Sequence, residues 1–284
     1  MTDPSSGSKN TMNHILKPAG AKTPPSSRLL RALFTSLAGE DSRRWTLTRH
    51  LRSDNPADLN GELRGIATFQ PLPGSPTTST TGGVGGSFKD LLYREEGEVP
   101  GTVVRGMAGL RWSKKYIWRL NCSDDVDDGD ADATSAGDHT NLDSGNDGRA
   151  GISVWFVKVA ASSSSGKDGS QQQQQQHDEA DYLFHEFEFD GESGAADNLN
   201  PESEDVFVAA PTPPAAPSST TASTTTILTA RGNHLCVKDM YRTAYAFSIH
   251  PETGEVLSWA SRHVVKGPKK NQEIVNWYQR EREG

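Results

Sequence analysis

The chain contains 284 residues, of which 33% are hydrophobic and 23% are charged, and its formal net charge at pH 7 is −8. This hydrophobic share excludes a protein that is globular along its whole length. No run approaches the roughly 20 apolar residues of a membrane-spanning helix, and two cysteines are too few for a disulfide framework. We therefore expect a soluble, intracellular protein of the cytoplasm, without a membrane partner.

The N-terminal segment, residues 1–26, is polar and lacks an apolar core of signal-peptide length, so we expect a disordered tail. A helix is predicted directly after it, because Ser27 is a suitable N-cap and Gly39 a suitable terminator. Between them, apolar residues recur at helical spacing. These are Leu29, Leu30, Leu33, Phe34 and Leu37.

After this helix the apolar pattern changes to a period of two, which is typical of β-strands. In the first such segment Trp45, Leu47 and Leu51 lie on one face. Nine or ten strands are predicted, at 44–51, 62–70, 90–96, 111–120, 151–159, 181–189, 227–237, 240–249, 255–264 and, as the tenth, 273–281. No helix recurs between them, so we expect a mainly β protein with one antiparallel barrel or sandwich.

Four polar segments separate these strands, and we interpret them as disordered insertions. The segment 71–87 is rich in Gly, Ser and Thr, 123–150 is acidic, 161–180 contains a poly-Gln run, and 190–226 is rich in Pro, Ser and Thr. Residues 27–284 then form one domain that these insertions interrupt. Because acidic residues are concentrated in the insertions, the remaining chain has a basic balance.

The charged segments carry no known ion-binding pattern. In the acidic tract, Val126 occupies position three of an EF-hand calcium loop, where an oxygen ligand is needed, and Ser135 occupies position twelve, where Glu is required. The Gly-rich segment is followed by neither a helix nor a Lys-Ser/Thr pair, so it is no phosphate loop. Lys and Arg are spread over many strands, and therefore we do not expect a nucleic-acid partner.

Several short motifs resemble an uncharacterised bacterial and fungal family, a domain of unknown function with a lipocalin-like (calycin-type) β-barrel. They include "GELRGIATFQP", "YIWRL" and "FHEFEF", and the most specific are His-x-Cys-x-x-Asp-x-Tyr at 234–241 and Lys-Gly-Pro-x-Lys at 266–270. The resemblance implies an up-and-down barrel that closes around an internal cavity. It also implies a structural contact between Trp45 of the first strand and an arginine, either Arg262 or Arg280.

Two constellations near the C-terminus are candidates for chemistry. His234 and Cys236 share a strand face and, with His185, could bind a metal, but isolated His and Cys pairs are more often structural, so we expect no metal. Asp239 and Tyr241 also share a face. With a histidine they could perform acid–base chemistry, but a hydrogen-bonded polar network is the simpler interpretation. We therefore assign no catalytic residue and no cofactor.

The expected function is binding of a small anionic or amphipathic ligand in the barrel of a monomer. The candidate ligand-binding residues are His185, His234, Cys236, Asp239, Tyr241, Lys266 and Lys270. Gly267 and Pro268 are expected to form a turn, which places the two lysines at the barrel rim. Two alternatives stay open, an enzyme that uses His185 or His234 with Asp239 or Tyr241, and a scaffold that binds partners through the insertions.

Overall fold

The structure is a computed structural model. It describes residues 24–39, 44–73, 89–100, 109–122, 150–159, 178–190, 208–215, 225–268 and 270–281. Most residues of the predicted tail and of the four predicted insertions lie outside these ranges.

The N-terminal helix α1 spans Ser27–Leu37. Its N-cap is Ser26 rather than the predicted Ser27, because the Ser26 hydroxyl accepts a hydrogen bond from Leu29 N at 3.2 Å. The hydroxyl of Ser27 instead accepts from Ala150 N at 3.0 Å and so attaches the helix to the barrel. The apolar face of the helix, including Leu33 and Phe34, is completely buried.

The strands follow the predicted order along the chain. They are β1 (Arg44–Ser53), β2 (Gly61–Pro71), β3 (Asp90–Glu98), β4 (Arg111–Cys122), β5 (Ala150–Val157), β6 (Ala180–Glu186), β7 (Glu188–Phe189), β8 (Thr226–Cys236), β9 (Asp239–Ile249), β10 (Val256–Lys266) and β11 (Asn271–Arg280). They form one antiparallel sheet in the order β6-β5-β4-β3-β2-β1-β11-β10-β9-β8-β7. Each strand therefore pairs with its neighbours in sequence, except that β6 and β7 lie at the two ends of this order, and β1 pairs with β11.

The segment 180–190 closes this sheet into a barrel. On one side β6 pairs with β5, and Phe187 N donates to Ile152 O at 2.8 Å. On the other side β7 pairs with β8, and Asp190 N donates to Thr229 O at 2.9 Å. The predicted mainly β, antiparallel up-and-down barrel with one helix is thus confirmed as a nearly closed barrel. The predicted strand at 181–189 is two strands because Phe187 interrupts it.

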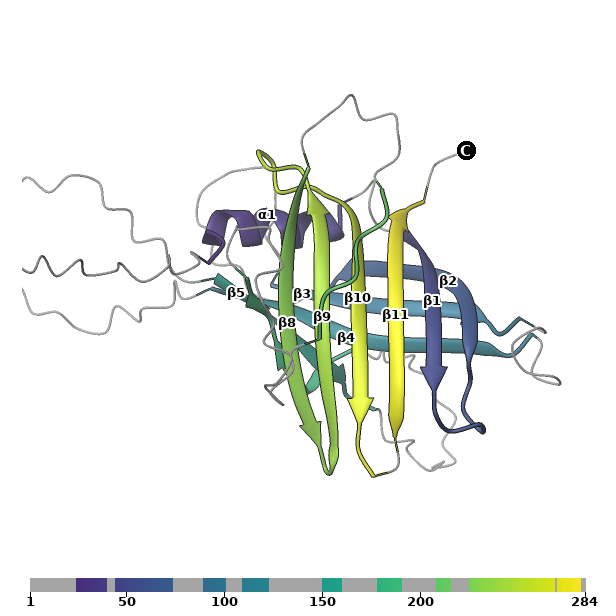
Figure 1. Cartoon of the computed structure of the whole chain (residues 1–284). Coiled ribbons are helices and arrows are strands. Elements are labelled where there is room, and N and C mark those ends of the chain that lie inside the picture. The colour runs from purple at the N-terminus through teal and green to yellow at the C-terminus, as the bar shows by residue number, and fades with distance from the viewer. Residues whose placement is uncertain are drawn as a thin grey trace, which may run out of the picture.

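Helix α1 lies across one end of the barrel (Figure 1). Ser36 of the helix accepts a hydrogen bond from Val256 N at 2.8 Å, at the start of β10. Beneath the helix the barrel is filled with aromatic side chains, of which Trp45, Trp259 and Tyr278 are completely or almost completely buried. The rings of Trp259 and Tyr278 stack with centroids 3.5 Å apart. The barrel interior next to the helix is therefore packed with aromatic rings.

The insertion boundaries differ from the prediction at several points. Four residues that the sequence predicts to lie in insertions belong to strands. They are Pro71 in β2, Ala150 in β5, Ala180 in β6 and Thr226 in β8. Residues 208–215 belong to the predicted insertion 190–226, yet they contact the barrel, because the Ser258 hydroxyl donates to their Pro214 carbonyl at 2.5 Å. Proline-rich backbone offers carbonyl acceptors to a sheet face without needing a sheet of its own.

Candidate functional site

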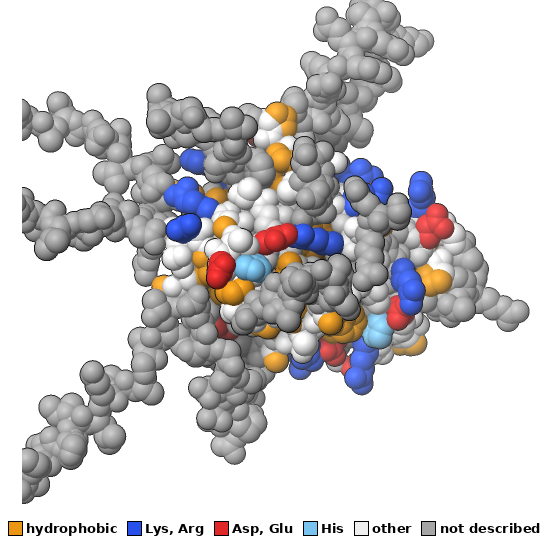
Figure 2. All heavy atoms as spheres, turned by 90° about the horizontal axis from the view of Figure 1, so that it is seen from above, with side chains coloured by type: hydrophobic (Ala, Val, Ile, Leu, Met, Phe, Trp, Pro, Cys, Tyr) orange, Lys and Arg blue, Asp and Glu red, His pale blue; other side chains and the backbone are white. Residues whose placement is uncertain are grey.

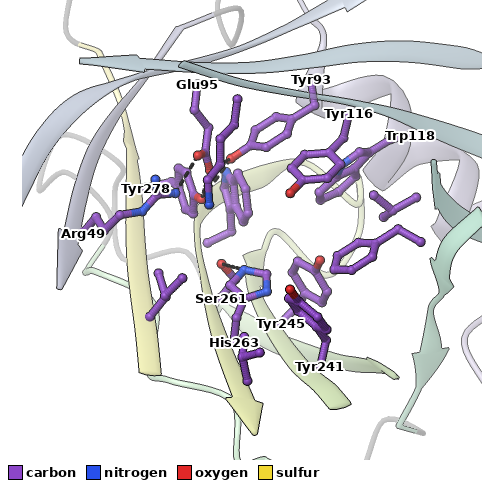
Figure 3. Close-up of a pocket in the computed structure, with 16 residues that line it drawn as sticks. Arg49, Tyr93, Glu95, Tyr116, Trp118, Tyr241, Tyr245, Ser261, His263 and Tyr278 are labelled. Atoms are coloured by element: carbon purple, nitrogen blue, oxygen red, sulfur yellow. Dashed lines mark hydrogen bonds and ion pairs between the residues drawn. The ribbon is translucent and has the colours of Figure 1, made fainter. Parts of the chain in front are cut away.

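A cavity of about 80 Å³ lies inside the barrel, in the half away from α1. Five tyrosines line it, together with Arg49, Glu95, Lys114, Ser261 and His263. The tyrosines are Tyr93, Tyr116, Tyr241, Tyr245 and Tyr278. Figure 3 shows Glu95, Tyr93 and Tyr116 on one side of the space, and Ser261, His263, Tyr245 and Tyr241 on the opposite side. Polar groups from opposite walls of the barrel thus face one volume.

The two-residue period of the strands and their register bring these side chains together. Glu95 of β3 is the direct partner of Lys114 of β4, and Tyr93 is the partner of Tyr116. Directly opposed residues of an antiparallel pair lie on the same face, so all four point into the barrel. Alternation along a single strand also turns the side chain of Arg49, on β1, into the barrel, because Arg49 lies two residues after the completely buried Leu47.

Arg49 and Glu95 form an ion pair in the barrel interior. Arg49 Nη2 donates to Glu95 Oε2 at 2.5 Å, and each side chain is only 4% exposed. Tyr93 and Tyr278 donate to the other carboxylate oxygen at 2.5 and 2.9 Å. Burial alone would raise the pKa of Glu95, but the Arg49 and Lys114 charges and these hydrogen bonds outweigh it and lower that pKa to about 2. Glu95 is therefore a carboxylate with all of its charge compensated.

A second polar chain continues from Arg49 across the cavity wall. Arg49 Nε donates to Asn276 Oδ1 at 2.7 Å, and Asn276 Nδ2 donates to Ser261 Oγ at 2.9 Å. Ser261 Oγ lies 3.2 Å from His263 Nε2, and His263 Nδ1 lies 3.1 Å from Thr243 Oγ1. Burial, followed by the charge of Lys114, lowers the pKa of His263 to about 3, so its ring is neutral at pH 7.

Lys114 is the exception among the charged groups of the cavity. In the described part of the chain, no hydrogen bond or ion pair joins its ammonium group to another residue. Its side chain is exposed to the cavity and its mouth, yet enough protein surrounds it that burial, then Arg49, lowers its pKa despite the opposing effect of Glu95. With Arg49 and Glu95 neutralising each other, Lys114 gives the cavity a net positive charge.

Among the candidate ligand-binding residues, only Tyr241 lines the cavity. His185 is buried beside the cavity, where its Nε2 lies 3.1 Å from Oη of the cavity residue Tyr245 and its ring stacks on Phe187. Burial, then the neighbouring His234, lowers the pKa of His185 to about 3. A bulge in the pairing of β5 with β6 turns His185 inwards, and this irregularity leaves no signal in the sequence.

The other candidates lie at the barrel rim. His234 is half-buried opposite Tyr241, with ring centroids 6.1 Å apart. Cys236 is an exposed free thiol, and Asp239 is its partner across the β8–β9 hairpin. Among the described residues, neither histidine is hydrogen-bonded to Asp239 or Tyr241, so the acid–base set considered from the sequence is not assembled. Nor do the described His, Cys, Asp and Glu residues form a group of three or more placed for a metal ion.

The two rim lysines lie at the β10–β11 hairpin. Lys270 donates to the Tyr241 hydroxyl at 2.8 Å and is 3.7 Å from Asp239, whereas Lys266 ends β10 and is exposed. Gly267 forms the turn, with its N donating to Lys270 O at 2.8 Å, and Pro268 follows it. A side chain at Gly267 would collide with Asp239, which explains the glycine. Lys270 therefore attaches one hairpin to the other, and both lysines lie outside the cavity.

The two structural arginine candidates behave differently. The Arg280 guanidinium lies over Trp45, 5.8 Å from the ring centroid, as their pairing in β1 and β11 allows. Arg262 instead forms an ion pair with Glu273 at 2.6 Å, because its side chain points out of the barrel. Seen from above, Lys and Arg side chains lie at separate places over the visible described surface (Figure 2).

Sequence reasoning did not identify Arg49, Glu95, Lys114 or His263. A signal for Arg49 was present, since the period that groups Trp45 with Leu47 also groups Arg49 with them. A charged residue at an inward position of a strand is a direct indication of an interior site. For the other three the faces of their strands were ambiguous, because polar and apolar residues do not alternate strictly there.

Residues 216–280, which include β8, β9, β10 and β11, match the model of a family described as "Family of unknown function (DUF6314)". No curated protein and no solved structure matches the chain. None of the described helices has the length and apolar character needed to cross a membrane. The match is thus limited to the C-terminal strands, and the description of the matched family names no activity.

Proposed function

We propose that this protein binds a small anionic ligand, of the carboxylate class, in the barrel cavity. The observation that carries the proposal is Lys114, a cation without a partner in a cavity whose other charges compensate each other. Lys114 is exposed to solvent at the open part of the cavity, so its ammonium group can attract a negative charge from solution. A bound carboxylate would supply that charge, and the hydroxyls of Tyr116 and Tyr241, which donate to no described residue, would donate hydrogen bonds to it.

The size of the cavity limits the ligand. Typical small-molecule sites span about 300 to 1,000 Å³, whereas this cavity of about 80 Å³ has room for only a few water-sized groups. The cavity thus suits a carboxylate group or a very small acid, and the rest of a longer ligand would extend through the mouth. The aromatic wall formed by Phe184, Tyr241 and Tyr116 would contact that extension.

Calorimetric titration with acetate, benzoate and octanoate tests this proposal. Lys114→Met removes the cavity cation, and the matched control Lys115→Met removes the next lysine, which is exposed and paired with Asp178 outside the barrel. A charge-assisted hydrogen bond contributes about 1.5–3 kcal/mol, so Lys114→Met should weaken carboxylate binding about 10- to 100-fold. Lys115→Met should leave it unchanged. Equal effects of the two substitutions, or no binding of any acid by the unaltered protein, would reject the proposal.

An acid–base enzyme built from His185 or His234 with Asp239 or Tyr241 is not favoured, since those groups are not hydrogen-bonded to each other. Ser261 and His263 are close together, but the far nitrogen of His263 contacts the Thr243 hydroxyl rather than a carboxylate. This arrangement satisfies buried polar groups without activating a nucleophile. The insertions required by the scaffold alternative lie mostly outside the described residues.

A further inference from the structure

The β8–β9 hairpin ends in an exposed apolar tip. Val237 is 91% exposed at the turn, and Leu235 is 62% exposed on the outward face of β8. Met240, the partner of Leu235 on β9, extends this outward face. Figure 1 shows the tip projecting at the end of the barrel opposite α1, beside the tip of β10–β11. The tip is thus a protruding apolar ridge rather than a flat patch.

The backbone of Val237 is also strained. Its φ is 57°, and it is the sole non-glycine residue with positive φ in the described parts of the chain. Branching at Cβ makes this conformation unfavourable for valine, whereas glycine or asparagine adopts it readily. The turn therefore carries a residue that is unfavourable both for its backbone conformation and for its contact with water. Strain of this kind clusters at binding sites and ligand clamps.

Basic side chains surround the apolar ridge. Lys238 is in the same turn, and Lys266 on β10 is the partner of Met240 on β9. Arg242 lies two residues after Met240 and therefore on the same face of β9. Within the described residues, no carboxylate forms an ion pair with any of these three cations. Lys270 is close to Asp239, the acidic residue of the tip. The hairpin tips therefore combine protruding apolar groups with these four cations, against Asp239 and against Asp54 and Asp58, which accept hydrogen bonds from Asn271 and Gln272 at the start of β11.

We propose that these two hairpin tips dock the protein onto an anionic lipid surface. Val237 and Leu235 would enter the boundary between headgroups and acyl chains, while Lys238, Arg242 and Lys266 would contact lipid phosphates and carboxylates. Two protruding aliphatic side chains are too small for a stable protein interface, which buries about 1,200 Å² or more. A lipid surface needs no complementary partner shape, and the surrounding cations match its charge.

This proposal differs from the sequence-based expectation of no membrane partner, which depended on the lack of an apolar run. A hairpin tip that only enters the headgroup region needs no such run. The proposal goes beyond the proposed ligand binding and does not depend on it. If both hold, the cavity lies in the half of the barrel that faces the lipid, because Tyr241 and Val265 line it directly above the tips.

Sedimentation of the full chain with lipid vesicles tests the docking. Vesicles of phosphatidylcholine alone are compared with vesicles containing about a quarter phosphatidylserine, at about 0.15 M salt. We expect binding to the anionic vesicles and little binding to the neutral ones. Leu235→Thr should weaken it about tenfold, since one aliphatic side chain no longer enters the lipid. The matched control is Ile227→Thr, an exposed aliphatic residue at the opposite end of the same strand, which should have no effect.

Val237→Asn separates a binding role from a structural one. Asparagine tolerates the positive φ, so the melting temperature should stay the same or rise, while vesicle binding should fall about tenfold. The docking proposal is overturned if the unaltered protein ignores anionic vesicles or binds neutral ones equally well. It is also overturned if Leu235→Thr and Ile227→Thr act alike, or if Val237→Asn instead converts a concentration-dependent dimer into a monomer in light scattering. Carboxylate binding by the Lys114 site is measured without vesicles and is unaffected by either result.

Discussion

Acidification from about pH 7 to about pH 5 should strongly destabilise this protein because two histidines, the buried His185 and the half-buried His263, are held in neutral form. The pKa of His185 and that of His263 are each lowered to about 3 from an ordinary value of 6.5. In the unfolded chain both residues bind protons as the pH falls below about 6.5, whereas in the barrel they do not until about pH 3. The unfolded state thus binds more protons in this window, and the stability decreases as the pH falls.

The magnitude follows from the linkage relation. Each such histidine costs about 1.4 kcal/mol for every pH unit well below its unfolded pKa, so the loss between pH 7 and pH 5 is about 2 kcal/mol per residue. The two together should remove about 4 kcal/mol from the free energy of unfolding, a large part of the ~5–15 kcal/mol of a typical domain. Glu95 adds nothing in this window, because its pKa is lowered from 4.5 to about 2 and its contribution is lost only at lower pH.

Urea unfolding, followed by tryptophan fluorescence at steps of about half a pH unit, measures this dependence. His185→Phe provides the control, since a phenyl ring fits beside Phe187 and cannot bind a proton. The substitution deprives the Tyr245 hydroxyl of its partner at every pH, but it should halve the slope of stability against pH. The reasoning fails if the unaltered protein loses less than about 1 kcal/mol between pH 7 and pH 5, or if His185→Phe leaves the slope unchanged.

Three further substitutions test the packing around the site. Arg49→Met should cost about 3–5 kcal/mol in denaturant unfolding, because it leaves the buried Glu95 carboxylate uncompensated, and adding Glu95→Leu should recover much of that loss. Gly267→Ala should lower the melting temperature, at about 1–3 kcal/mol, since a Cβ there collides with the neighbouring hairpin, whereas Gly151→Ala meets open space and should be neutral. Ser26→Ala removes the cap of α1 and should cost about 1 kcal/mol, and a larger loss would mean that the cap also attaches the helix to the barrel.

The fold was accessible from the sequence because its determinants are local. Alternation of apolar and polar residues along short segments defines strands with one buried face. The lack of helices between these segments limits neighbouring strands to antiparallel pairing. The helix was equally clear, with Leu30, Leu33, Phe34 and Leu37 on one face, and its cap was misplaced by one residue because Ser26 and Ser27 are both acceptable caps.

The site was much less accessible, because sequence motifs emphasised the wrong part of the barrel. His234, Cys236 and Asp239 form a conspicuous pattern near the end of the chain, and the structure places them at a hairpin tip. His185 needed a bulge to point inwards, and a strict period of two cannot represent a bulge. The composition of segment 208–215 predicts disorder, but the segment contacts the sheet through the backbone carbonyl of Pro214. Every residue has such a carbonyl, so composition cannot predict this contact.

By itself, the sequence determined that the chain forms one helix and a meander of antiparallel strands, since hydrophobic periodicity and turn residues act over a few positions. Only the tertiary structure decided that Arg49, Glu95, Lys114 and His263 share one cavity. These residues come from β1, β3, β4 and β10, and their meeting depends on the register of each strand pair and on barrel closure through 180–190. Register and closure are set by non-local packing, so Lys114 faces this cavity only once the barrel has formed.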